Sequence, residues 1–122
     1  MKIAVTSKSN NLESEIDPRF GRCSYFLIVD TDTMSFEHLS NESAMASGGA
    51  GIQAAQNVAK TGVEVVVTGN MGPNAFQTLS AAGIRVFIGA NGTVKEAVEK
   101  YKKGELKEAA APNVGSHSGM RR

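Results

Sequence analysis

The chain has 122 residues, of which 41% are hydrophobic and 20% charged, and its formal net charge is +1. This length suits one domain with an ordinary buried core, and the small net charge gives no indication of a nucleic-acid or membrane-surface partner. The single cysteine, Cys23, excludes an intrachain disulfide and any site in which this chain supplies four thiolates.

The sequence also predicts a cytoplasmic protein. A lone, unpaired thiol is typical of a reducing compartment. The apolar run in residues 2–6 is far too short for a signal peptide. No stretch approaches the ~20 apolar residues of a membrane-spanning helix, so no membrane association is expected.

The first part of the chain predicts three strands. Residues 2–6 form a short β-branched run, residues 25–30 form an apolar run, and residues 35–40 alternate apolar and polar side chains. A Thr- and Asp-containing turn at residues 31–34 joins the second and third strands into a hairpin. The long polar segment at residues 7–24 is expected to be a loop.

The second part predicts alternating helices and strands. The expected helices span residues 52–60, 73–82 and 94–103, and the expected strands span residues 63–69 and 84–89. Ile52 and Ala55 belong to the apolar stripe of the first helix. Pro73 suits the first position of the second helix, and Thr93 with Glu96 forms a capping box before the third. One more helical turn is expected after Gly104.

The order of these elements predicts an α/β three-layer domain with a five-stranded mixed sheet, in strand order 3-2-1-4-5. The two later strand–helix units need right-handed crossovers, so they extend the sheet as parallel strands. Four loops then meet at one edge, outside the carboxyl ends of strands, where open α/β sheets bind ligands. These loops are residues 7–24, 41–51, 69–73 and 89–93.

A glycine cluster lies at the entrance of the first helix. The segment GAGIQA, which begins at Gly49, fits the dinucleotide pattern G-x-G-x-x-A. However, about eight loop residues separate the strand from the first glycine, and the acidic residue expected after the next strand is missing. The other interpretation is that Gly48, Gly49 and Gly51 open the helix start, whose free N–H groups favour an anion.

The segment Arg19, Phe20, Gly21, Arg22 and Cys23 lies at the same predicted edge. Neighbouring cations lower the pKa of a thiol and favour the thiolate, which binds soft metals. The two arginines can also hold an anionic ligand through charge-assisted hydrogen bonds. The alternative is that Cys23 packs as a small apolar residue.

Acid–base catalysis has little support in the sequence. Asp17, Asp30, Asp32 and Glu42 are scattered and belong to no catalytic motif, so they are interpreted as solvated turn residues. The residues alone therefore identify no catalytic site. His117, in the C-terminal segment, becomes a candidate ligand only if a metal is present.

Taken together, the segments DPRFGRCSYFLIVD and GGAGIQAAQNVAKTGVEVVVTGNMGPNAFQTLSAAGIRVFIGANGTVKEAVEKYKKGEL closely resemble the dinitrogenase iron–molybdenum cofactor biosynthesis family. This is the small NifX and NafY type, which also forms the C-terminal domain of NifB proteins. The resemblance rests on R-F-G-R after an acidic residue, on G-G-x-G-x-x-A, on VTGNMGPNA and on GTVKEAV followed by GEL. It indicates one cofactor-binding domain at residues 1–108 and a flexible tail at residues 109–122.

This resemblance implies a ribonuclease-H-like fold and a nitrogen-fixation-related carrier of an iron–sulfur or iron–molybdenum cluster, and so predicts that the protein is not an enzyme. A preassembled cluster brings its own sulfides, so few protein ligands are needed. The expected metal ligands are Cys23 and His117. The expected cofactor-binding residues are Arg19, Phe20, Gly21, Arg22, Cys23, Gly48, Gly49, Gly51, Gly69, Asn70 and Gly72.

The expected partners are metallocluster donor and acceptor proteins, and the expected oligomeric state is a monomer or a weak homodimer. Two other functions stay open on the sequence alone. One is a small enzyme or sensor that binds a phosphate-like anion at the same edge without metal. The other is a purely interacting subunit.

Overall fold

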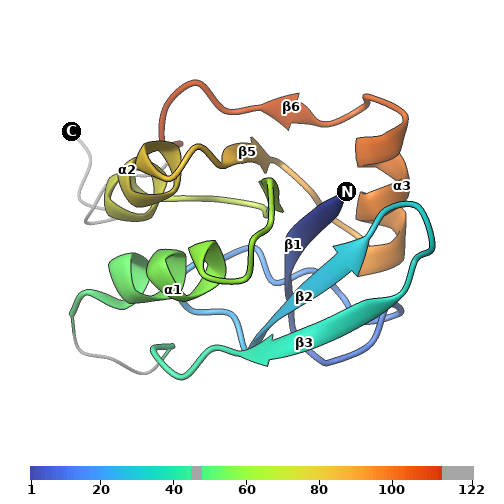
Figure 1. Ribbon diagram of the computed structural model, residues 1–122, viewed down its shortest axis with the longest axis horizontal. Helices are drawn as coiled ribbons and strands as arrows, with labels where there is room; N and C mark the ends of the chain where they lie inside the picture. The colour runs from blue at the N-terminus through green and yellow to red at the C-terminus, as the bar shows by residue number, and fades with distance from the viewer. Residues whose placement is uncertain (45–47, 114–122) are drawn as a thin grey trace.

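The computed structural model describes residues 1–44 and 48–113. In these residues six strands form one mixed sheet in the order β3-β2-β1-β4-β5-β6, and three helices cover its faces (Figure 1). The strands are β1 (Lys2–Ser7), β2 (Tyr25–Asp30), β3 (Phe36–Ser40), β4 (Val65–Val67), β5 (Arg85–Ile88) and β6 (Lys107–Glu108). The helices are α1 (Ala50–Ala59), α2 (Pro73–Ala81) and α3 (Val94–Lys102).

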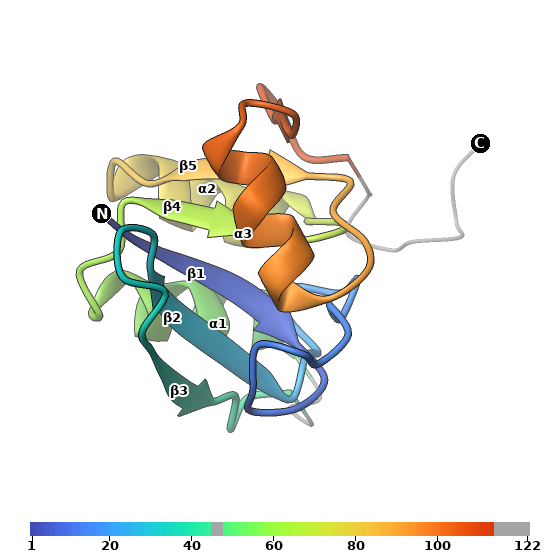
Figure 2. The same ribbon diagram turned by 90° about the vertical axis from the view of Figure 1, so that its right-hand side faces the viewer.

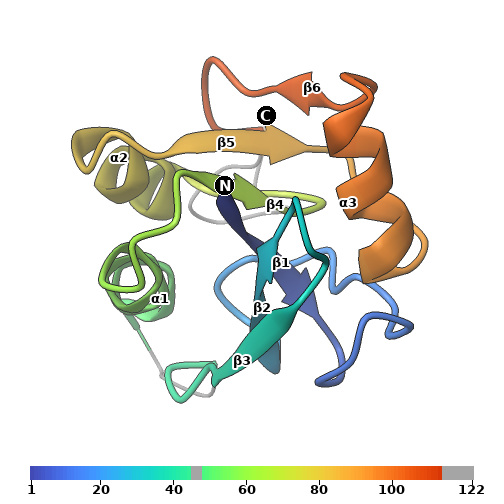
Figure 3. The same cartoon turned by 45° about the vertical axis from the view of Figure 1, so that its right-hand side comes forward.

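The directions of the strands place the loops as the sequence predicts. β1, β4 and β5 are parallel, and Figure 3 shows them side by side in the sheet. β2 is antiparallel to β1, and β3 is antiparallel to β2. The carboxyl ends of β1, β3, β4 and β5 and the start of β2 therefore share one edge, which we call the carboxyl edge.

The sheet has one strand more than the five expected. β6 pairs antiparallel with β5 through Phe87–Glu108 and Ile88–Lys107. The helical turn expected after Gly104 is therefore wrong. Two exposed, charged residues carry no strand pattern, and only the open edge of β5, with its unpaired backbone groups, makes them a strand. The division of the chain at residue 108 stays a prediction.

The core lies on both faces of the sheet. α1 and α2 cover one face, and α3 covers the other (Figure 2). The helix residues buried on the first face are Ala54, Ala55, Val58, Ala75 and Leu79, and those on the second are Val94, Ala97 and Val98. All three residues of β4 are buried, as expected for a central strand that is covered on both faces.

The starts of α2 and α3 follow the sequence signals. Pro73 is the first residue of α2. The Thr93 hydroxyl accepts the Glu96 N–H at 3.1 Å, and the Glu96 carboxylate accepts the Thr93 N–H at 2.9 Å. The predicted capping box is therefore confirmed, and it fixes where α3 begins.

Helix α1 differs from the prediction at its start. It begins at Ala50, two residues earlier than expected, and its buried residues are Ala50, Ala54, Ala55 and Val58. Ile52 lies outside this stripe and is 37% exposed, so its assignment to the stripe was wrong. None of the helices in the described residues is long and apolar enough to cross a membrane.

Candidate functional site

The loops at the carboxyl edge are joined by backbone hydrogen bonds. Ile16 N–H donates to the Gly92 carbonyl at 2.9 Å, and Asn70 N–H donates to the Pro18 carbonyl at 2.8 Å. Arg19 and Asn70 also form a parallel bridge. The loop before β2 therefore contacts both the loop that follows β4 and the loop that follows β5, and the predicted convergence of distant segments is confirmed.

Asp17 fixes the start of the loop that carries the two arginines. Its side chain is buried, and its carboxylate accepts the Arg19 backbone N–H at 2.9 Å and the Arg19 Nε at 3.3 Å. Its carbonyl accepts the Thr6 hydroxyl at 2.6 Å. Phe20 is buried against Phe26, with ring centroids 5.1 Å apart. The loop is thus anchored by a carboxylate and by an aromatic ring.

Both arginines lie on the surface of the carboxyl edge. The Arg19 side chain is 65% exposed, and its hydrogen bonds to Asp17 raise the pKa of the guanidinium above its ordinary value. Arg22 is exposed and donates from Nη1 to the Ala44 carbonyl at 2.7 Å. Both side chains therefore carry positive charge at the outer rim of these loops.

Two of the predicted glycines are places of close backbone approach. A Cβ at Gly69 would lie 2.8 Å from the Pro18 Cα, closer than real Cβ atoms come. A Cβ at Gly21 would lie 3.2 Å from the Gly51 Cα. The segment of residues 17–23, which we call the arginine loop, therefore packs against the start of α1 and against the loop after β4.

The first turns of α1 and α2 are neighbours at this edge. A Cβ at Gly51 would lie 3.6 Å from the Ala75 Cβ. Gly49, at φ 73°, precedes α1, and Gly72, in an extended conformation, precedes α2. Neither helix has a side-chain cap or an acidic residue in its first turn. Two positive helix-dipole ends therefore lie close together with no carboxylate of their own.

Cys23 is not the low-pKa thiol that its neighbours in sequence suggested. The residue is 0% exposed, and its Sγ lies 3.4 Å from the Phe20 carbonyl oxygen, to which the S–H donates. Burial raises the pKa of Cys23 to about 12, and the negative charge of Asp17 adds to the rise. The expectation of an arginine-stabilised thiolate was wrong, because both guanidinium groups are solvated and face other partners.

The buried thiol gives the protein a pH-dependent stability at alkaline pH. Below pH 9.0 the thiol is neutral in both states, whereas between about 9 and about 12 only the unfolded chain ionises. We expect the free energy of unfolding to fall as pH rises through that window, by up to about 1.4 kcal/mol per pH unit from this group. Urea titrations of wild type and Cys23→Ala from pH 8 to pH 11 measure it. If the free energy of unfolding falls equally with pH in both proteins, the thiol already ionises in the folded state.

Asn41 is a site residue that sequence reasoning missed. It is buried, and its Nδ2 donates to the Gly21 carbonyl at 3.1 Å and to the Cys23 carbonyl at 2.9 Å. Its Oδ1 accepts the Ser43 hydroxyl at 2.8 Å. Asn41 therefore holds the arginine loop to the segment after β3. In the sequence it is only one more polar loop residue.

Of the two predicted metal ligands, only Cys23 lies in the described residues, and its ligand role stays a prediction. The described residues contain no group of three or more His, Cys, Asp or Glu side chains that could hold a metal ion. His117, the second predicted ligand, lies outside the described residues. The groups at the carboxyl edge that can donate to an anion include the backbone N–H groups of the two helix starts and the guanidinium groups of Arg19 and Arg22.

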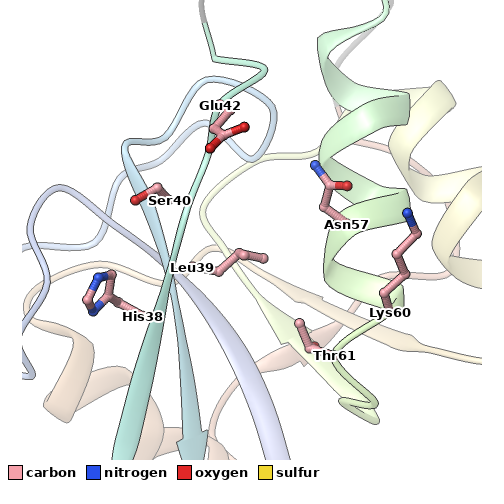
Figure 4. A pocket seen from close by; sticks show the side chains of 7 residues that line it. All are labelled: His38, Leu39, Ser40, Glu42, Asn57, Lys60 and Thr61. Atoms are coloured by element: carbon pink, nitrogen blue, oxygen red, sulfur yellow. The ribbon is translucent and has the colours of Figure 1, made fainter.

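A separate groove lies between β3 and α1 (Figure 4). Its volume is about 540 Å³, and Leu39 points into it between the strand and the helix. The residues that line it are His38, Leu39, Ser40, Glu42, Asn57, Lys60 and Thr61. It contains none of the residues that the sequence predicts for the ligand site.

Comparison with known proteins gives matches over most of the chain. A family model described as dinitrogenase iron-molybdenum cofactor matches residues 1–104. The apo form of the orange protein from Desulfovibrio gigas is 46% identical, with a TM-score of 0.89 over 92% of this chain and 95% of that chain. A Thermotoga structure described as a candidate NifB protein is 38% identical, with a TM-score of 0.77 over 88% and 91%. An uncharacterised protein from Methanocaldococcus jannaschii is 28% identical over 111 residues, which cover 88% of this chain and 91% of that protein.

Proposed function

The chain belongs to the dinitrogenase iron-molybdenum cofactor family, and from this premise we propose that it is a non-enzymatic carrier of an iron–sulfur or iron–molybdenum-type cluster. The cargo binds at the carboxyl edge and passes from a donor protein to an acceptor protein. The proposal deepens the accessory role that the family match indicates, and the ribonuclease-H-like classification stays a prediction beside it.

The observation that carries this proposal is the grouping of cationic side chains and free backbone N–H donors at the carboxyl edge. The uncapped first turns of α1 and α2 meet there, and Arg19 and Arg22 lie on the adjoining loop. Backbone N–H groups and guanidinium groups donate hydrogen bonds to anions. Metal–sulfide clusters of this type are anionic and present sulfide acceptors, so these donors match their chemistry.

The proposed contacts to the cargo come from three segments. Arg19 and Arg22 compensate its charge, and the backbone at Gly48 and Gly49 donates hydrogen bonds from the start of α1. Gly69, Asn70 and Gly72 form the facing wall of the site. A site made of such contacts holds its cargo without covalent bonds, which suits a protein that must release it.

Ligation of the cargo by Cys23 would require a rearrangement of the arginine loop. The thiol has no exposed surface, its S–H donates to the Phe20 carbonyl, and its pKa is raised. A metal would have to reach the buried sulfur, replace that hydrogen bond and deprotonate the sulfur. We therefore propose that the arginines and the helix starts are sufficient for binding and that Cys23 is a packed residue beneath the site.

A phosphate-like anion is the second candidate ligand, because helix N-termini bind phosphate as well as other anions. The two candidates differ in their spectra. A metal–sulfide cargo absorbs visible light by charge transfer, whereas a phosphate ligand leaves the protein colourless and free of metal and sulfide.

The test is anaerobic reconstitution with ferrous iron, molybdate and sulfide, followed by desalting and by metal and sulfide analysis. We expect wild type and Cys23→Ser to retain equal amounts of metal and the same visible absorption. If Cys23→Ser loses its metal while wild type retains it, thiolate ligation is established. The proposal that the arginines and helix starts are sufficient for binding is then refuted. A colourless wild-type protein that binds inorganic phosphate instead would refute the carrier proposal.

A further inference from the structure

One residue near the end of the described chain contacts the proposed site. The Asn113 Oδ1 accepts the Met71 N–H at 2.7 Å, and the Asn113 backbone N–H donates to the Met71 carbonyl at 3.1 Å. The Asn113 Nδ2 donates to the Asn70 Oδ1 at 3.0 Å. A single side chain, distant in sequence, thus binds two successive residues of the loop between β4 and α2.

That loop in turn holds the arginine loop. The Asn70 N–H donates to the Pro18 carbonyl at 2.8 Å, and Gly69 lies against Pro18 without room for a side chain. A continuous series of contacts therefore runs from Asn113 through Asn70 and Pro18 to Arg19, which is the next residue. Movement of the loop after β4 would move the start of the arginine loop with it.

The segment that carries Asn113 is itself anchored to the sheet. β6 pairs with β5, and the Glu108 carboxylate pairs with Arg85 at 2.7 Å. The Ala109 N–H donates to the Val86 carbonyl at 2.8 Å. The segment is thus held at β6 and again at Asn113, and it spans from the β5 side of the sheet to the carboxyl edge.

We propose that Asn113 is a positioning residue: it holds the loop between β4 and α2 in the arrangement that receives the anionic cargo. An asparagine is suited to this role because its amide both accepts and donates, whereas alanine does neither and aspartate only accepts. The part of this inference that concerns cargo rests on the proposed function, and the part that concerns the loop does not.

The loop is tested first, on the protein without cargo, by amide hydrogen exchange. In Asn113→Ala we expect exchange of the Met71 amide to accelerate by about fivefold or more, because its acceptor is removed. In Asn113→Asp the acceptor remains, so the Met71 amide should stay close to its wild-type rate. Asn57→Ala, an asparagine change in the groove beside α1, serves as the control and should leave Met71 unchanged. Unchanged exchange at Met71 and Asn70 in Asn113→Ala would overturn the inference.

The cargo is tested second, by the rate at which the reconstituted iron–molybdenum–sulfide species is lost to a chelator. We expect loss from Asn113→Ala to be several-fold faster than from wild type or Asn57→Ala. Altered exchange with an unchanged rate of loss would overturn the positioning role and leave the carrier proposal intact. If wild type takes up no metal, the carrier proposal fails, whereas the exchange result still decides the loop contact.

Discussion

Replacement of Gly69 by alanine is expected to destabilise the protein by about 2 kcal/mol or more and to displace the arginine loop. The added Cβ would lie 2.8 Å from the Pro18 Cα and 3.0 Å from the Pro18 Cβ, so it meets backbone and a rigid ring. Overpacking of this kind typically costs 1–3 kcal/mol, roughly, because neither neighbour can rotate away. Urea unfolding at neutral pH measures the effect.

Gly48→Ala is the matched control for this substitution. Gly48 lies in the same glycine-rich edge, but a Cβ there would meet nothing within 4 Å. We expect a change within about 0.5 kcal/mol, the usual range for a surface position. Equal destabilisation by both substitutions would contradict the close approach of the two loops and would point to a general intolerance of side chains at this edge.

The second large effect is expected from removal of the two cations. The double variant Arg19→Gln/Arg22→Gln should bind the reconstituted metal–sulfide species about a hundredfold more weakly than wild type. Each charge-assisted hydrogen bond contributes about 1.5–3 kcal/mol, so each arginine accounts for about a factor of ten. Metal retention after desalting, measured over a range of salt concentrations, checks this. Binding by wild type should weaken more steeply with salt than binding by the variant.

Lys100→Gln/Lys102→Gln provides the control for charge. Both lysines lie in the last turn of α3, whereas the carboxyl edge lies at the start of that helix, so this double variant removes the same two charges without changing the site. We expect unchanged retention of metal. If Lys100→Gln/Lys102→Gln weakens binding as much as the double arginine variant does, attraction depends on overall charge, and the assignment of Arg19 and Arg22 fails.

Much of the sheet could be predicted because its signals are local. The three-valine strand, the alternation in residues 35–40 and the capping box at Thr93 each arise from neighbouring residues. Chain connectivity and crossover handedness then determine the strand order. β6 could not be predicted in this way, because Lys107 and Glu108 become a strand only through the open edge of β5.

The site was predicted less completely, because its decisive contacts are long-range. Sequence placed Cys23 next to Arg22 but gave no sign that the thiol turns into the core while the guanidinium turns outward. Asn41 and Asn113 hold loops through amide contacts to segments about 20 and 40 residues away. Nothing in the local sequence distinguishes such an asparagine from a solvated one.

The meeting of two helix starts has a consequence for the empty protein. Dipole ends of like sign repel each other, and Asp17 offsets only part of the positive charge that the two arginines add at this edge. Under the proposed function, an anion bound there would lower this repulsion, and the loaded form would be the more stable one by mass action. An acceptor protein would then have to supply the free energy of release.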